Sequence, residues 1–286
     1  VMMGAPWKVF FKDEKNIIID VDGNIDVDGD VARPFPCSIT NAEICSSGLI
    51  ATWVDHDLRL ARMAMLDIDE SIKDGITKSD LRLMRNTSDV AGSKWSHAID
   101  AEPLCMSVGE NKIFFALWSR GIYCIDFEAT EKWRIPLFEN PDKSPPRAKE
   151  ITAISVLDDY AIVWSRDGTF KKINSESGDL EFEGSIEVEC DLESVFNYGE
   201  KFLLSSKDGW VWEYENQQIT VARKLRGTIQ DAIFDGEDWR IICWRDDIML
   251  RGESSRRAEL GVQIIMNNGA WSVMDNQGQI SPHMKE

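Results

Sequence analysis

Four cations recur at matching places along this chain and could together bind an anionic group. Each lies within two residues of a polar turn that follows a short apolar segment: Arg120, Arg166, Lys207 and Arg245. Arginine presents a planar pair of donors to a carboxylate, so a surface carrying these side chains would suit an acidic peptide or a carboxylate ligand. The alternative is that acidic neighbours pair locally with these cations and cancel their field; the neighbours are Asp167, Asp208, Asp246 and Asp247.

A second charged segment, DVDGNIDVDGD at 20–30, has the carboxylate density of a calcium loop, in which oxygen ligands at alternate positions surround the ion. The weak candidate ligands are Asp20, Asp22, Asp26, Asp28 and Asp30. Neither EF-hand register fits, because the position that must be glycine is Ile25 or Val31. The two Asp-Gly pairs in the segment are typical of hairpin turns. We therefore predict two acidic turns and no metal site.

The remaining residue types with chemical potential form no recognisable site. His56, His97 and His283 are far apart and lack the spacing of zinc ligands. No nucleophile elbow is present, although a triad is a spatial arrangement that sequence order does not reveal. We predict no catalytic residue and no cofactor.

Composition narrows the class of partner. Asp and Glu outnumber Lys and Arg by 50 to 32, for a net charge of −18. Phosphate neutralisation requires clustered cations, so nucleic acid and an anionic membrane surface are both disfavoured. No apolar run reaches the length of a membrane span.

The six cysteines contain no C-x-x-C pair and lie mostly in apolar strand-like contexts. This indicates small buried side chains in a reducing compartment, and the cytoplasm is the default location. A secreted disulfide framework is the alternative, and because the chain opens on Val1, a trimmed leader is compatible with the sequence.

A repeated sequence pattern runs through the chain and places many of these residues at strands and turns. An apolar strand, a polar turn, a second apolar strand and a tight turn recur seven times, at 9–23, 44–57, 106–121, 154–168, 195–209, 233–247 and 264–278. Fixed-period self-similarity indicates an array of one supersecondary unit. The fourth copy continues into a third and a fourth strand, which completes an antiparallel meander. Such a meander cannot bury both faces alone, so we predict an all-β, seven-bladed β-propeller of four-stranded antiparallel blades, with 1–286 as a single domain.

The third blade carries a family resemblance. GIYCID at 121–126 followed by EKWRIPL at 131–137 resembles the repeat of quinoprotein-like (PQQ-like) propellers, in which an outer strand carries a Trp. SKWSHAI at 93–99 resembles a second copy of that outer strand, and 168–186 a looser third. WD40-like propellers are the nearest competitor, but their Gly-His to Trp-Asp pairing does not recur here. The cofactor-binding residues of quinone dehydrogenases map onto no position of this chain.

Two interruptions and the last blade depart from the repeat. An insertion at 67–92 falls in blade two, and insertions in repeat arrays often carry binding. A proline-rich segment at 139–149 is predicted to be an exposed loop. The chain ends soon after the third strand of blade seven, so residues 1–6 are candidates to supply its fourth strand. The recurring Trp near the end of the second strand is expected to pack between blades; its copies are Trp53, Trp118, Trp164 and Trp244.

These observations lead to a non-enzymatic β-propeller scaffold that binds a protein or peptide partner through one turn face, with the four recurring cations as its contact surface. The alternative is a small-ligand-binding protein or a hydrolytic or redox enzyme that uses the central channel. A further alternative is that the chain is one domain of a larger assembly.

Overall fold

The computed structural model describes residues 3–83, 90–138, 149–267 and 269–284, and the chain is an all-β, seven-bladed β-propeller, as predicted. Each sheet is antiparallel and its strands follow one another in chain order. Six sheets have four strands, and the last has three in the described residues. The chain divides into two compact units, and Val1–Leu137 and Asn174–Asp179 form unit 1.

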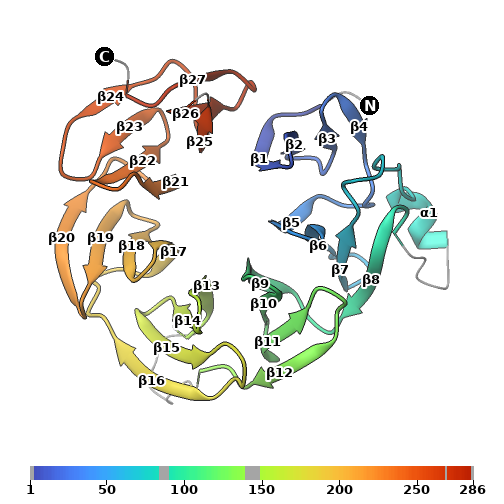
Figure 1. Ribbon diagram of the computed structural model, residues 1–286, viewed down its shortest axis with the longest axis horizontal. Coiled ribbons are helices and arrows are strands. Elements are labelled where there is room, and N and C mark those ends of the chain that lie inside the picture. The colour runs from blue at the N-terminus through green and yellow to red at the C-terminus, as the bar shows by residue number, and fades with distance from the viewer. Residues whose placement is uncertain (1–2, 84–89, 139–148, 268, 285–286) are drawn as a thin grey trace. The chain divides into compact units, whose positions relative to one another are not determined.

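Unit 1 holds the first three blades (Figure 1). Blade one contains β1 (Pro6–Lys12), β2 (Lys15–Asp20), β3 (Ile25–Val27) and β4 (Asp30–Ala32). Blade two contains β5 (Ile39–Cys45), β6 (Gly48–Asp55), β7 (Leu60–Leu66) and β8 (Ser93–Ile99), with helix α1 (Lys78–Leu83) between its last two strands. Blade three contains β9 (Pro103–Val108), β10 (Lys112–Leu117), β11 (Gly121–Asp126) and β12 (Glu131–Ile135).

Unit 2 comprises Phe138–Ile173 and Leu180–Glu286 and holds the strands of the last four blades. Blade four contains β13 (Ile151–Val156), β14 (Tyr160–Ser165), β15 (Thr169–Asn174, whose last residue is grouped with unit 1) and β16 (Leu180–Ser185). Blade five contains β17 (Leu192–Tyr198), β18 (Lys201–Ser206), β19 (Trp210–Glu215) and β20 (Gln218–Lys224). Blade six contains β21 (Ile229–Phe234), β22 (Trp239–Cys243), β23 (Asp246–Met249) and β24 (Ser254–Arg256). Blade seven contains β25 (Gly261–Asn267), β26 (Ala270–Asp275) and β27 (Ile280–Pro282).

One irregularity recurs in every blade. The register between the first and second strands shifts by one residue near the start of the first strand, as between Ile151 and Ala153 or between Ile229 and Asp231. A bulge of this kind bends a strand and increases its twist. Its repetition at the same place identifies the seven sheets as copies of one unit.

The core lies between successive blades. The second strand of a blade is buried along nearly its whole length, as in β14 and β18, whereas the outer strands β16 and β20 are mostly exposed. Trp164 from blade four packs against Phe202 of blade five, with ring centroids 5.2 Å apart. Within each unit, successive sheets therefore bury their facing surfaces against one another, as the stacking argument predicts.

The cysteines behave as small apolar residues. All six are free, and four are buried: Cys45, Cys105, Cys124 and Cys243. Burial raises the pKa of the Cys105 thiol to about 12, which keeps it protonated near neutral pH.

The three irregular segments are described in part. The insertion contains α1, whose first turn is capped because the Thr77 hydroxyl accepts a hydrogen bond from the Asp80 amide at 3.2 Å. The predicted loop at 139–149 lies almost entirely outside the described residues. Gly4 donates to the Asp20 carboxylate at 2.6 Å and Ala5 accepts from Val21 at 3.0 Å, so this segment lies beside blade one. Two expectations stay predictions: that residues 1–6 complete blade seven, and that residues 1–286 form a single domain.

Candidate functional site

The four recurring cations occupy equivalent turns, each between the second and third strands of its blade. Arg120 lies between β10 and β11 in unit 1. Arg166, Lys207 and Arg245 lie at the corresponding turns of blades four, five and six in unit 2. Their assignment as a binding surface stays a prediction, because position alone does not establish contact with a partner.

The four cations differ in whether their charged groups form ion pairs or hydrogen bonds with other residues of the protein. Arg166 is only partly exposed, and its guanidinium lies 3.3 Å from a carboxylate oxygen of Glu150 and 3.7 Å from one of Asp191. Arg245 donates to the carbonyl oxygen of Ala258. Arg120 and Lys207 are exposed, and within the described residues neither side chain has an ion pair. These two are therefore the cations most available to an external anion.

Three of the four neighbouring carboxylates, Asp167, Asp246 and Asp247, pair with cations other than the recurring ones. Asp167 lies 2.9 Å from Lys149. Burial would raise the pKa of Asp167, but hydrogen bonds from Lys149 and Ser165 outweigh it and hold the pKa below its usual range. Asp246 lies 3.8 Å from Arg226, and Asp247 lies 2.6 Å from Arg257. These three acids therefore pair elsewhere, whereas Asp208 lies exposed beside Lys207, and local cancellation at that turn stays a prediction.

Two of the four recurring tryptophans do not pack between blades, which corrects the expectation for them. Trp53 and Trp164 lie within β6 and β14 and are 2% and 0% exposed, as predicted. Trp118 and Trp244 are 37% and 57% exposed. Each follows the last residue of its strand, and the φ of 57° at Trp244 turns its side chain away from the inward direction of β22.

Trp244 lies among exposed residues of neighbouring segments. Its indole covers Gly227, where an added Cβ would come within 3.0 Å of the indole nitrogen. Its carbonyl oxygen accepts from the Gly261 amide at 2.9 Å, next to Leu260, which is 43% exposed. The turn that carries Lys207 contacts the same connection, because Gly209 accepts from the Leu225 amide at 2.8 Å. We call this surface the turn face, defined as the recurring cations Lys207 and Arg245 together with Arg226, Trp244 and Leu260. It leaves out two of the four predicted cations, because Arg120 lies in unit 1 and Arg166 pairs with Glu150.

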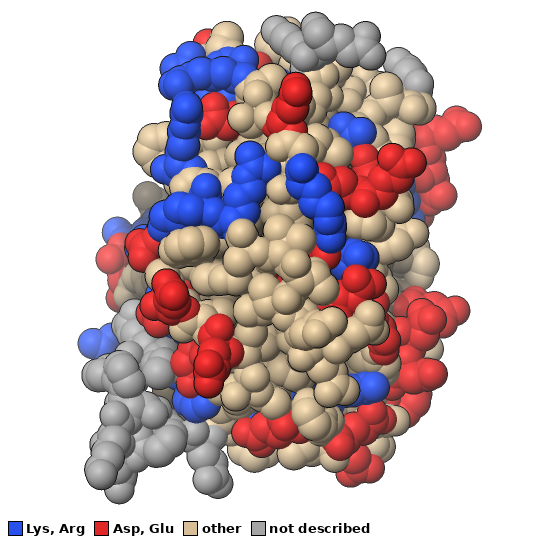
Figure 2. All heavy atoms as spheres, turned by 90° about the vertical axis from the view of Figure 1, so that its left-hand side faces the viewer, with Lys and Arg blue, Asp and Glu red and all other residues tan. Residues whose placement is uncertain are grey.

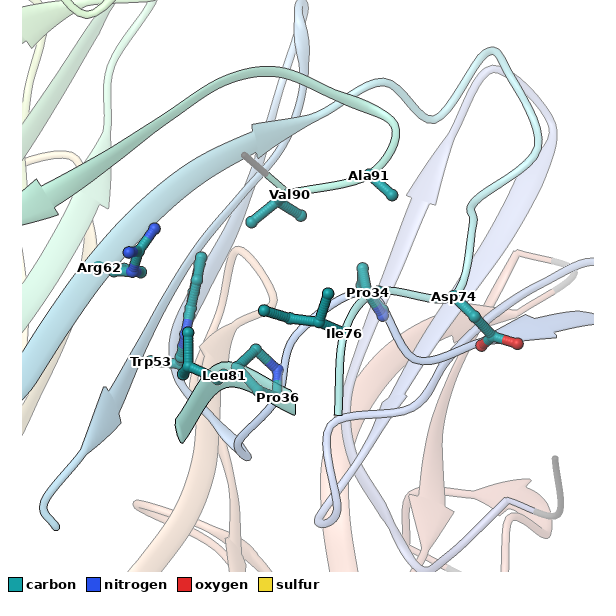
Figure 3. Close-up of a pocket in the computed structure, with 10 residues that line it drawn as sticks. Pro34, Pro36, Trp53, Arg62, Asp74, Ile76, Leu81, Val90 and Ala91 are labelled. Atoms are coloured by element: carbon teal, nitrogen blue, oxygen red, sulfur yellow. The ribbon is translucent and has the colours of Figure 1, made fainter. Parts of the chain in front are cut away.

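The insertion in blade two forms a pocket with the blade beneath it. The pocket has a volume of about 240 Å³ and apolar walls from Pro34, Pro36, Trp53, Ile76, Leu81 and Val90. Figure 3 shows the side chains of Trp53, Ile76, Leu81 and Val90 directed toward one another, with Arg62 beside Trp53. Arg62 is 4% exposed, so the pocket combines apolar walls with one buried cation. This combination suits an apolar group that carries a negative charge.

Two hydrogen bonds to the Arg33 backbone hold the insertion over this pocket. Asp74 accepts from the Arg33 amide at 2.8 Å, and the Gly75 amide donates to the Arg33 carbonyl oxygen at 2.9 Å. A Cβ on Gly75 would lie 2.0 Å from the carbonyl oxygen of Pro34, so only glycine permits this approach. The sequence located the insertion, but the pocket depends on distant residues that only the fold brings together.

The acidic segment at 20–30 forms turns. Asp20 is 1% exposed, and its carboxylate accepts hydrogen bonds from the amides of Gly4, Asp22 and Asn24 and from the Asn24 side chain. These donors occupy the oxygens that a calcium ion would need. Asp26 accepts from the Gly29 amide at 2.6 Å and Asp28 from the Asn16 amide at 3.0 Å, as in tight hairpins.

The histidines are not brought together. His97 stacks on Trp95 with ring centroids 5.4 Å apart, and His283 is buried beside Arg240 and the carbonyl of Ile241. Among the described residues, no group of three or more His, Cys, Asp or Glu side chains is arranged to hold a metal. No helix in the described parts of the chain is both long enough and apolar enough to span a membrane.

Comparison with known proteins supports the fold. No family model matches the sequence, and no curated protein matches it significantly. Among solved structures, the β-propeller domain of Swd1 from Myceliophteria thermophila is 13% identical with a TM-score of 0.66, covering 97% of this chain and 95% of that one. The WD40 β-propeller domain of Doa1 is 10% identical with a TM-score of 0.66, covering 97% and 92%.

BamB from Moraxella catarrhalis is 13% identical with a TM-score of 0.62, covering 96% of this chain and 83% of that one. At these identities the likeness is one of fold. The likeness therefore supports the β-propeller fold, and the structures that this chain resembles include a WD40 β-propeller domain and BamB.

Proposed function

We propose that this protein is a non-enzymatic scaffold that binds a protein or peptide partner through the turn face. The observation that carries the proposal is the 57% exposure of Trp244 among the cations of that face. Trp and Arg are enriched among the residues that dominate binding energy, because they bury a large area and supply directed donors. A fold widely used for recognition is consistent with this role but does not establish it.

The chemistry of the turn face favours an acidic partner segment with an apolar anchor. Arg226 has a side chain that is 76% exposed and only a 3.8 Å contact to Asp246, so it can reorient toward a partner carboxylate. Trp244 and Leu260 would then bury apolar area beside these charges. The overall charge of −18 would oppose an acidic partner at long range, so the local cations must supply the attraction.

The test is affinity enrichment of the tagged protein from its native lysate, followed by mass spectrometry. The binding variant carries Lys207→Glu and Trp244→Ala, and Arg120→Glu is tested separately. Arg166 is left intact, because a glutamate there would face Glu150 and destabilise the fold. Glu237→Lys is the matched control, since Glu237 lies in the turn before β22 and Trp244 follows its other end.

A stoichiometric partner should be recovered with the wild type and with Glu237→Lys, and lost from Lys207→Glu/Trp244→Ala. Removal of one dominant contact residue weakens binding by about 2 kcal/mol, or roughly 30-fold, which is enough to lose a micromolar partner during washing. Recovery of the same partner with the binding variant would exclude the turn face as the contact surface.

Small-ligand binding is the second candidate function, and the insertion pocket is the observation that favours it. Its apolar walls and the Arg62 cation suit a small aromatic carboxylate. Benzoate should raise the melting temperature of the wild type and leave that of Leu81→Trp, which fills the pocket, unchanged. An equal effect on both proteins would count against this function.

A further inference from the structure

The outer edge of blade four differs from an ordinary solvent-facing strand. β16 is the last strand of its sheet, and among the described residues it pairs only with β15. Leu180 is 53% exposed and Phe182 is 48% exposed, so the strand presents two large apolar side chains to solvent. An exposed, apolar edge strand is a template for pairing with another extended chain.

The hydrogen-bond pattern between β15 and β16 directs some backbone amide and carbonyl groups of β16 toward the open edge. The Ile186 amide donates to the Gly168 carbonyl oxygen at 2.9 Å. Gly168 and Ile186 therefore form a hydrogen-bonded pair. Hydrogen-bonded and non-hydrogen-bonded pairs alternate in an antiparallel ladder, so Thr169 opposite Ser185 and Lys171 opposite Glu183 are non-hydrogen-bonded pairs. The amide and carbonyl groups of Ser185 and Glu183 therefore point away from β15, toward the open edge.

An aromatic pocket adjoins the same edge. It has a volume of about 360 Å³ and is lined by residues of blades four and five that include Tyr160, Phe170, Phe182, Phe202 and Tyr214. The rings of Phe170 and Phe182 lie 5.9 Å apart, and a Cβ on Gly184 would come within 2.9 Å of both. Gly184 thus leaves space for the two rings that form one wall. A pocket of this size accepts one large apolar side chain.

The edge is acidic. Glu181, Glu183, Glu187 and Glu189 are all exposed in and just after β16. Glu181 lies 3.7 Å from Lys172, whereas the described residues include no ion pair to Glu183, Glu187 or Glu189. Figure 2 looks onto the outer strands of unit 2, where Lys and Arg gather over the upper part, toward β20 and β24, and Asp and Glu predominate below. Charge complementarity at β16 therefore calls for a basic occupant.

We propose that β16 binds an extended basic peptide segment as an added antiparallel or parallel strand, with one aromatic side chain of that segment in the adjacent pocket. Main-chain hydrogen bonds to Glu183 and Ser185 would supply affinity, and the pocket and the glutamates would supply specificity. This surface is distinct from the turn face, since it uses the outer strand of a blade and carries the opposite charge. The protein would then hold two partner segments of opposite charge at separate surfaces.

The experiment measures binding of a fluorescein-labelled peptide of alternating Lys and Val with a central Phe, by fluorescence anisotropy on the full chain. Glu183→Pro removes the outward amide while leaving the ladder to β15 intact, because that amide does not bond to β15. Phe182→Ala removes one wall of the pocket. Ile219→Ser is the matched control, since Ile219 is 38% exposed on the neighbouring outer strand β20.

The peptide should bind the wild type and Ile219→Ser within twofold of each other, and Glu183→Pro and Phe182→Ala at least tenfold more weakly. The amides of Glu183 and Ser185 should become protected from hydrogen exchange when the peptide binds. A counterpart with Glu in place of Lys should not bind. Absence of saturable binding up to about 1 mM, or binding that Glu183→Pro leaves unchanged, would overturn the proposal. A concentration-dependent dimer abolished by Glu183→Pro would also overturn it, by assigning the edge to a second copy of this chain.

Discussion

A buried ion pair beside blade six, between Arg257 and Asp247, is joined by hydrogen bonds to strand β27. Breaking this pair should destabilise the protein. Arg257 is 7% exposed and Asp247 is 1% exposed, and their closest atoms, Nε and Oδ1, lie 2.6 Å apart. The same guanidinium donates to the hydroxyl of Ser281 and to the carbonyl oxygen of Pro282, both at 2.7 Å. Arg257→Met keeps the bulk of the side chain but leaves the Asp247 carboxylate buried without its cation.

The expected cost follows from this burial. Removing one partner of a buried pair costs about 3–5 kcal/mol. Because both members are almost fully buried, we expect about 4 kcal/mol, which at a urea m-value of about 3 kcal/mol/M lowers the unfolding midpoint by about 1.3 M. The assay is urea unfolding followed by tryptophan fluorescence. Arg226→Met is the control, and it should change stability by less than about 0.5 kcal/mol because its contact to Asp246 is exposed.

A double-mutant cycle separates the ion pair from general disruption. Asp247→Leu alone should cost about as much as Arg257→Met, whereas the double variant should cost less than the sum of the two by about 3 kcal/mol, since an apolar pair leaves no buried charge. A loss below about 1 kcal/mol in Arg257→Met, or additive losses in the cycle, would refute this reasoning.

Two further predictions concern pH and a turn. Burial lowers the pKa of His283 below its usual range, and the negative charge of Asp247 opposes this effect only in part. Stability is therefore full above the unfolded pKa of about 6.5 and falls as the pH drops through the folded pKa, and His283→Gln should flatten the fall measured between about pH 7.5 and 5.5. If both proteins lose equal stability, another group titrates. Gly168 has a φ of +82° and a Cβ there would lie 2.4 Å from the Ile186 carbonyl oxygen, whereas Gly199 has a φ of +54° and open space. Gly168→Ala should therefore lower the free energy of unfolding by at least about 1 kcal/mol more than Gly199→Ala, and equal losses in urea unfolding would contradict this.

The repeat in the sequence was enough to predict the fold, because every copy places two apolar strand segments and their turns at fixed offsets. The copy at 154–168 matches β13, β14 and the turn that follows them. The recurring bulge was not predicted, since it depends on how neighbouring strands twist rather than on a particular residue type.

The candidate site could be predicted only in part. The positions of the recurring cations at equivalent turns followed from the repeat, but the engagement of Arg166 by Glu150, 16 residues away, did not. The exposure of Trp244 depends on where β22 ends, and strand ends are the least certain part of a sequence-based prediction. The sequence carries one signal of the exposed edge of β16, which is an outer strand with Leu180 and Phe182 among glutamates. It does not reveal the adjoining pocket, because that pocket includes residues of the next blade.

The measurement that most directly tests the turn face as the contact surface is site-specific photo-crosslinking in the native lysate. A photoreactive benzoyl-phenylalanine replaces Trp244 in one protein and Glu237, before the other end of β22, in a second. The account predicts a covalent adduct with one partner from position 244 and none from position 237. An adduct from position 237 alone, or equal adducts from both, would contradict it.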